Sequence, residues 1–105
     1  MQPRHRTAHR ALQAFALAGW VVAALGFTTA PALLGAPLDA WATTAARGLW
    51  WVLVIVHPIE MLVFAPTLRR RGRLDARNLL GIFVFGAIHL LGIRWTDAAA
   101  AAEAS

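Results

Sequence analysis

The sequence predicts an all-α integral membrane protein with three transmembrane helices, of which the second and third form an antiparallel hairpin. Of the 105 residues, 59% are hydrophobic and only 14% are charged. A soluble protein is about 45–50% apolar and about 25% charged, and a short chain buries too little surface to hide a larger apolar fraction. The composition therefore excludes an ordinary soluble domain and a disordered chain.

The absence of cysteine excludes disulfides, thiolate metal sites, thioether attachment of haem and cysteine nucleophiles. The ten basic residues are all arginine, and together with the abundant Ala, Gly, Leu and Trp this indicates GC-rich coding and favours a bacterial source. The net charge is +5. Because the arginines gather at the ends of apolar runs, they indicate membrane topology and anionic lipid headgroups as partners, and no nucleic acid.

The first apolar run extends from Ala11 to Ala30 and carries no charge. Its length matches the roughly 20 residues that a helix needs to cross a bilayer, and Pro31 favours its end. A cleaved signal peptide is the main alternative, because Ala30-Pro31-Ala32 resembles a cleavage site after an apolar stretch. The run is longer than the apolar region of a typical signal peptide, and Pro31 lies inside the candidate cleavage site, so we expect residues 1–32 to be retained.

Two further apolar runs follow, from Gly48 to Leu68 and from Leu79 to Trp95. The helix of the second run is expected to begin earlier, near Ala40, with Asp39 as its N-cap. The prolines and glycine in residues 31–39 predict an irregular loop, and residues 69–78 predict a short basic turn. The chain thus divides into a basic cytoplasmic arm (1–10), a three-helix transmembrane domain (11–95) and an Ala-rich disordered tail (96–105).

The arginine distribution predicts the orientation of the spans. The arm before the first run contains three arginines, and five more lie in the basic turn: Arg69, Arg70, Arg71, Arg73 and Arg77. By the positive-inside rule both segments face the cytoplasm, where these five contact lipid headgroups. With three spans, the N-terminus is then cytoplasmic and the C-terminus is periplasmic or extracellular. Trp41, Trp50, Trp51 and Trp95 would lie at the outer interface, whereas Trp20 would pack inside the bundle or against lipid.

Small residues at helical spacing predict where the helices approach one another. In lipid, helices associate through close packing of small side chains and through polar contacts. The first run has such a face, and the third run carries glycines on its own. The predicted packing positions are Ala16, Gly19, Ala23, Gly26, Gly81, Gly86 and Gly92. They indicate packing on the chain's own hairpin or, alternatively, docking of another membrane protein or a second copy.

Three polar residues lie inside the apolar runs. His57 and Glu60 are three residues apart and share one helical face, with Pro58 between them, and His89 lies in the third run. A hairpin that turns symmetrically about Arg73 brings His57 level with His89, and Glu60 level with Gly86. We therefore expect a candidate intramembrane polar cluster of His57, Glu60 and His89.

Three interpretations of this cluster remain open. In the first, Glu60 hydrogen-bonds an imidazole and locks the hairpin, which contributes about 0.6–1.7 kcal/mol. In the second, the two histidines bind a metal or a b-type haem. In the third, Glu60 handles protons or a substrate. No Ser/His/Asp set, phosphate loop or carboxylate pair is present, so the sequence predicts no enzyme. His5 and His9, in the basic arm, are expected to be solvated.

Residues 48–93 also resemble a known family. The matching features are Trp50-Trp51, the His57-Pro-Ile-Glu60 element, the basic Arg69-Arg70-Arg71-Gly72 turn and the segment from Phe83 to Gly86. The stretch is similar to the transmembrane protein 254-like family of small multi-span proteins, with His57, Glu60 and Gly86 at matching positions. The resemblance implies a membrane-embedded hairpin and no catalytic activity. Pro58 and His89 are not part of the family pattern.

The sequence therefore predicts an integral protein of the bacterial inner membrane. Crossing a bilayer three times takes about 60 residues, which leaves little chain for a soluble active site. A non-catalytic accessory or scaffold subunit is the favoured function, with no cofactor. The alternative is an intramembrane site at His57, Glu60 and His89 that binds a metal or haem, or that carries protons in a small oligomeric transporter.

Overall fold

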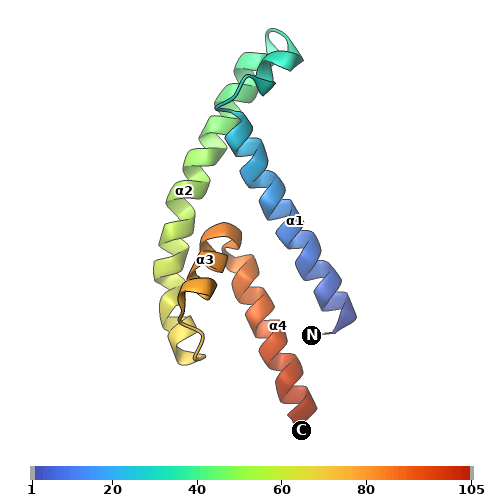
Figure 1. Cartoon of the computed structure of the whole chain (residues 1–105), viewed down its shortest axis with the longest axis vertical. Helices are drawn as coiled ribbons and strands as arrows, with labels where there is room; N and C mark the ends of the chain where they lie inside the picture. Colours follow the sequence, from blue (N-terminus) through green and yellow to red (C-terminus); the bar gives the residue numbers. More distant parts are fainter. Residues whose placement is uncertain (1, 105) are drawn as a thin grey trace.

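The computed structural model describes residues 2–104, which fold into four α-helices and one short 3-10 helix (Figure 1). The elements in chain order are α1 (Pro3–Leu25), η1 (Ala30–Leu34), α2 (Leu38–Arg70), α3 (Ala76–Phe85) and α4 (Ala87–Ala104). The predicted all-α class is confirmed. The early start of the second helix is confirmed as well. Asp39 is not its N-cap, however, because α2 begins at Leu38 after Pro37, and Asp39 lies inside the first turn, where its Oδ1 accepts from the Ala40 N–H at 2.8 Å.

Helices α1 and α2 meet at one end of the molecule and diverge toward the other, with η1 connecting them (Figure 1). The contact depends on small residues: Ala23 is fully buried, and a Cβ placed on Gly26 would lie 2.7 Å from the Ala46 Cβ. Arg47 Nε donates to the Gly26 carbonyl at 2.8 Å. Gly19, predicted to belong to the same packing face, has no neighbour within 4 Å of such a Cβ.

Both of these helices are long and apolar enough to cross a membrane. At 1.5 Å per residue, the 33 residues of α2 extend for about 50 Å. Almost none of either apolar stretch is buried within the chain, and large apolar side chains such as Phe15 (77% exposed) and Leu62 (78%) face outward. This exposure differs from that of a core helix in a soluble protein, which buries its apolar face.

The third apolar run does not form a single helix, so its prediction as one continuous span is wrong. Gly86 has φ 60° and ψ −137°, and the chain reverses there from α3 into α4. In Figure 1, α3 rises beside α2 and α4 returns toward the end from which α3 came. The 10 residues of α3 extend for only about 15 Å, half the thickness of the hydrocarbon region. The two helices form a short hairpin between α1 and α2.

Because of this reversal, the two ends of the chain lie at the same end of the molecule (Figure 1). His5 stacks on Trp95 with ring centroids 4.5 Å apart. The structure therefore does not hold the two ends apart, as three complete spans would require, and Trp95 does not lie with Trp50 near the α1–α2 junction. The side of a membrane on which each terminus lies stays a prediction. The tail predicted to be disordered is helical through Ala104, and the basic arm is helical from Pro3. Met1 and Ser105, which complete these two segments, lie outside the described residues.

A small apolar core holds the α3–α4 hairpin against α2. It consists of Leu68, Ile82, Leu90 and Ile93, all at most 6% exposed, with Met61, Phe64 and Leu79 packed around it. The turn between α2 and α3 is closed by Asp75, the N-cap of α3, whose side chain accepts from the Asn78 N–H at 2.8 Å. The turn is centred on Arg73, as predicted, so the predicted hairpin register applies up to Gly86.

Candidate functional site

Glu60, in the second half of α2, lies against the reversal at Gly86. Its Oε2 atom is buried and has no hydrogen-bond partner among the described residues. A Cβ placed on Gly86 would overlap this oxygen and would lie 3.3 Å from His57 Cδ2. The structure thus brings together His57, Glu60 and Gly86, as the predicted register required, and only glycine leaves room for the carboxyl group.

His57 lies one turn before Glu60 and is surrounded by aromatic rings from two other helices. Its Nδ1 is 2.7 Å from the Leu53 carbonyl oxygen. Because a carbonyl oxygen only accepts, the Nδ1–H group is the donor of this hydrogen bond. The centroid of the imidazole is 5.3 Å from the ring of Trp20 and 6.5 Å from that of Phe83. The side chain is therefore fixed in position by its own helix and by α1 and α3.

Trp20 of α1 connects the three helices that meet at this site. Its indole N–H donates to the Val84 carbonyl at 2.7 Å, and its ring lies 5.6 Å from Trp50 and 5.8 Å from Phe83. Val84 is in the last turn of α3, where carbonyl groups lose their helical partners. Trp20 thus caps the end of α3 from another helix. The predicted packing inside the bundle is confirmed, but the hydrogen bond had no sequence pattern to indicate it.

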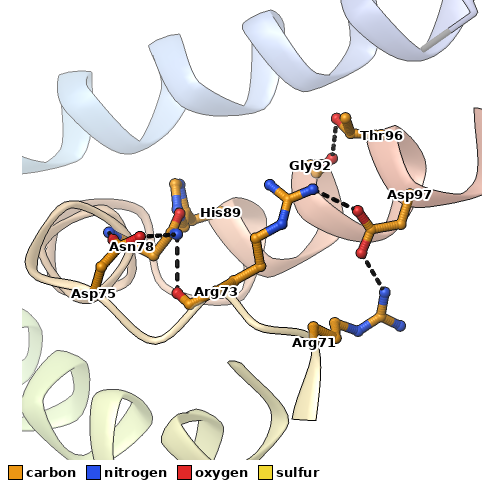
Figure 2. A network of polar contacts seen from close by, with 8 residues as sticks. All are labelled: Arg71, Arg73, Asp75, Asn78, His89, Gly92, Thr96 and Asp97. Carbon is orange, nitrogen blue, oxygen red and sulfur yellow. Dashed lines mark hydrogen bonds and ion pairs between the residues drawn. The ribbon is translucent and has the colours of Figure 1, made fainter. Parts of the chain in front are cut away.

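His89 does not join His57 and Glu60, so the predicted three-residue cluster is wrong for this fold. Its Nε2 lies 3.0 Å from Asn78 Oδ1 (Figure 2). Its ring fills the space beside Gly81. The cause is the reversal at Gly86, which turns the start of α4 back onto α3. Gly81 and Gly86 thus both permit close approach, each to a different polar side chain.

The end of the molecule that contains the α2–α3 turn and the start of α1 is called the basic end below. A polar network there connects α4 to the α2–α3 turn (Figure 2). Asp97 accepts from Arg71 at 2.8 Å and from Arg73 at 2.7 Å, and Asn78 Nδ2 donates to the Arg73 carbonyl at 2.9 Å. Sequence reasoning missed Asp97 because it lies in an Ala-rich segment that was predicted to be disordered. The signal that could have indicated it is the charge of Asp97, which is opposite to that of the basic turn.

The histidines of the N-terminal helix also belong to this end, and the prediction that His5 and His9 are solvated is wrong. His9 Nε2 lies 3.2 Å from the Ile88 carbonyl, and its ring packs against Gly92. His5 stacks on Trp95. Gly92 therefore acts as a packing position, but against α1 rather than against the second apolar run. These contacts fasten α4 to the start of α1.

Metal binding finds little support in this arrangement. Within residues 2–104 no three His, Asp or Glu side chains lie close enough together to hold a metal ion. His57 and His89 face different partners, so they do not form the opposed imidazole pair that a b-type haem requires. What the site offers chemically is a carboxyl group whose Oε2 has no hydrogen-bond donor within residues 2–104, next to the imidazole of His57 and a backbone reversal.

Comparisons with protein-family models, with curated proteins and with solved structures find no match for this chain. The resemblance of residues 48–93 to the transmembrane protein 254-like family therefore stays a prediction.

Proposed function

We propose that the chain is a small integral protein of a bacterial inner membrane and serves as a non-catalytic accessory or scaffold subunit. In this arrangement α1 and α2 cross the bilayer, and the α3–α4 hairpin enters and leaves it from the cytoplasmic side. The observation that carries the proposal is the outward exposure of two long apolar helices, of whose apolar stretches almost no residue is fully buried by the rest of the chain.

The arginine distribution supports a cytoplasmic location for the basic end of the molecule. The N-terminal turns of α1 and the segment from Arg69 to Arg77 around the α2–α3 turn together hold eight of the ten arginines, and they lie at the same end as both termini (Figure 1). Short segments rich in arginine stay in the cytoplasm. Arg69 and Arg70, which are exposed there, would lie among anionic headgroups, whereas Arg71 and Arg73 are engaged by Asp97. Both termini are then cytoplasmic.

The hydrogen bonds of the polar side chains within the chain support the scaffold role. His9, Trp20, Asn78 and Asp97 each form a hydrogen bond to another part of the chain. The exposed apolar faces remain for lipid, for another membrane protein or for a second copy of the chain. Cross-linking in native membranes would distinguish a homo-oligomer from a complex with a different subunit.

The unpartnered oxygen of Glu60 favours a second candidate function, that of a proton carrier in a small oligomeric transporter. An ionised carboxylate at mid-membrane costs about 2.5–3.5 kcal/mol on insertion scales, so such residues are commonly functional. The oxygen is buried between α2 and the α3–α4 reversal, next to the ring of His57. A second copy of the chain would be needed to complete a path across the bilayer.

Replacing Glu60 by Gln separates the two functions, because the amide has nearly the same shape but cannot exchange the proton. Proton flux would be followed with a pH-sensitive dye in proteoliposomes under an imposed potential. If the chain is a scaffold, liposomes that contain the wild-type chain or E60Q show no more proton flux than empty liposomes. The two chains then also assemble to the same extent. Flux through the wild type that is lost in E60Q, but kept in the exposed control variant E103Q, would establish the proton carrier instead. Recovery of the chain as a monomer in aqueous buffer would overturn both.

A further inference from the structure

The basic end of the molecule contains an open cleft with a volume of about 480 Å³, within the range typical of small-molecule sites. It lies between the start of α1, the α2–α3 turn and the α3–α4 hairpin. We infer that this cleft binds the phosphate group of an anionic lipid. The inference rests on the proposed membrane location, since the lipid must come from the bilayer. The residues that matter for it are His9, Gln13, Arg73, Arg77, Asn78 and His89.

The charges of the cleft favour an anion. Its one acidic lining residue, Asp75, already uses both carboxylate oxygens on Asn78, at 2.8 Å to the backbone N–H and 3.2 Å to the side-chain amide. Arg73 is paired with Asp97. Arg77, by contrast, forms no ion pair with any residue between 2 and 104. Its guanidinium is thus left for a ligand, and the planar fork of arginine suits two oxygens of one phosphate.

The donors of the cleft come from separate helices. Gln13, from α1, makes no hydrogen bond to other described residues and has its amide available, while Arg77 approaches from α3. The two histidines shape the cleft rather than bind the anion, since His9 is directed at the Ile88 carbonyl and His89 at Asn78. An anion held by Gln13 and Arg77 would bridge α1 and α3.

The position of the cleft along the helices points to a lipid rather than to a soluble phosphate. In α1, Arg10 is followed by the apolar run, and in α3, Arg77 and Asn78 are followed by apolar residues. Both helices therefore change from charged to apolar at the cleft, as happens at a boundary between headgroups and acyl chains. Just beyond it, Phe15 is 77% exposed and Leu80 is 62% exposed, so apolar surface is available for the acyl chains.

The test uses the full chain in dodecylmaltoside micelles, with phosphatidic acid as the probe and inorganic phosphate as the second arm. We expect saturable binding of phosphatidic acid. Arg77→Gln removes a charge-assisted hydrogen bond and should weaken binding by about tenfold. Arg69→Gln makes the same charge change at the same end, outside the cleft, and should weaken binding by less than about threefold. Gln13→Ala, on a different helix, should weaken it by about fivefold.

Each other outcome decides against the inference. Equal losses in R77Q and R69Q would mean diffuse attraction to the arginines, and an unchanged Gln13→Ala variant would mean that α1 takes no part. Inorganic phosphate binding as tightly as phosphatidic acid would overturn the lipid source. Helical content by circular dichroism identifies a misfolded variant. Carbonate extraction of the same proteins from membranes is scored separately, so that a failure of membrane insertion is distinguished from a failure of lipid binding.

Discussion

The ring of His5 is stacked on the ring of Trp95, with centroids 4.5 Å apart and planes inclined by 9°. His5 lies in the first turn of α1 and Trp95 lies near the middle of α4. The contact therefore joins the N-terminal helix to the C-terminal helix. It is incompatible with an odd number of complete spans between them. The reversal at Gly86 is what makes it possible, and it converts a predicted third span into a hairpin that opens toward the basic end.

The shared location of the termini predicts their labelling pattern. The chain has no cysteine, so single cysteines can be introduced at Gln2, at Ala104 and at Leu33, which is 90% exposed in η1. We expect a membrane-impermeant maleimide to label the first two only in inverted vesicles and the third only in spheroplasts. Labelling of A104C from the periplasm would restore three spans and contradict the structure.

Gly86 is predicted to be the least replaceable glycine. Gly86→Ala combines a backbone conformation that L-residues avoid with an overlap on Glu60, and it should lower the free energy of unfolding by about 3 kcal/mol. The measurement is loss of helicity on titration with SDS in mixed micelles.

Two other glycines serve as controls for Gly86. Gly72 also has a positive φ, of 68°, but open space around it, so G72A should cost only about 1 kcal/mol of strain. Gly19 is in helix α1 with nothing nearby, and G19A should stabilise the chain by up to about 1 kcal/mol. If G86A behaved like G72A, the contact with Glu60 would contribute nothing.

Trp20 is predicted to stabilise the fold through its N–H as well as its ring. Trp20→Phe keeps most of the apolar contact with Phe83 but leaves the Val84 carbonyl without its donor, which should cost about 1 kcal/mol. The same SDS titration measures it. Trp51→Phe, at a position 57% exposed, should change the free energy of unfolding by less than about 0.5 kcal/mol. Equal effects of the two variants would mean that the hydrogen bond is unimportant.

Hydropathy and helical spacing predicted the parts of this fold that follow from local pattern. They predicted the two long helices, the early start of α2, and the meeting of Glu60 with Gly86 across a turn centred on Arg73. They did not predict the reversal, because a glycine inside an apolar run is equally compatible with a straight helix, and its positive φ depends on tertiary contacts. Once the reversal was missed, His89 and Asp97 were assigned to the wrong surroundings.

Asp97 provides the last prediction, because it joins α4 to the basic turn through Arg71 and Arg73. These side chains are 31–40% exposed, so the two ion pairs together should contribute only about 1 kcal/mol, and less as salt screens them. Asp97→Asn should therefore lower stability in the SDS titration at low salt, with the difference shrinking toward zero near 1 M salt. Hydrogen exchange should accelerate over residues 98–104, whose helical turns follow the lost anchor. The exposed Glu103→Gln variant removes the same charge and should change neither quantity. A salt-independent loss in D97N would show that packing, and not charge, holds α4 in place.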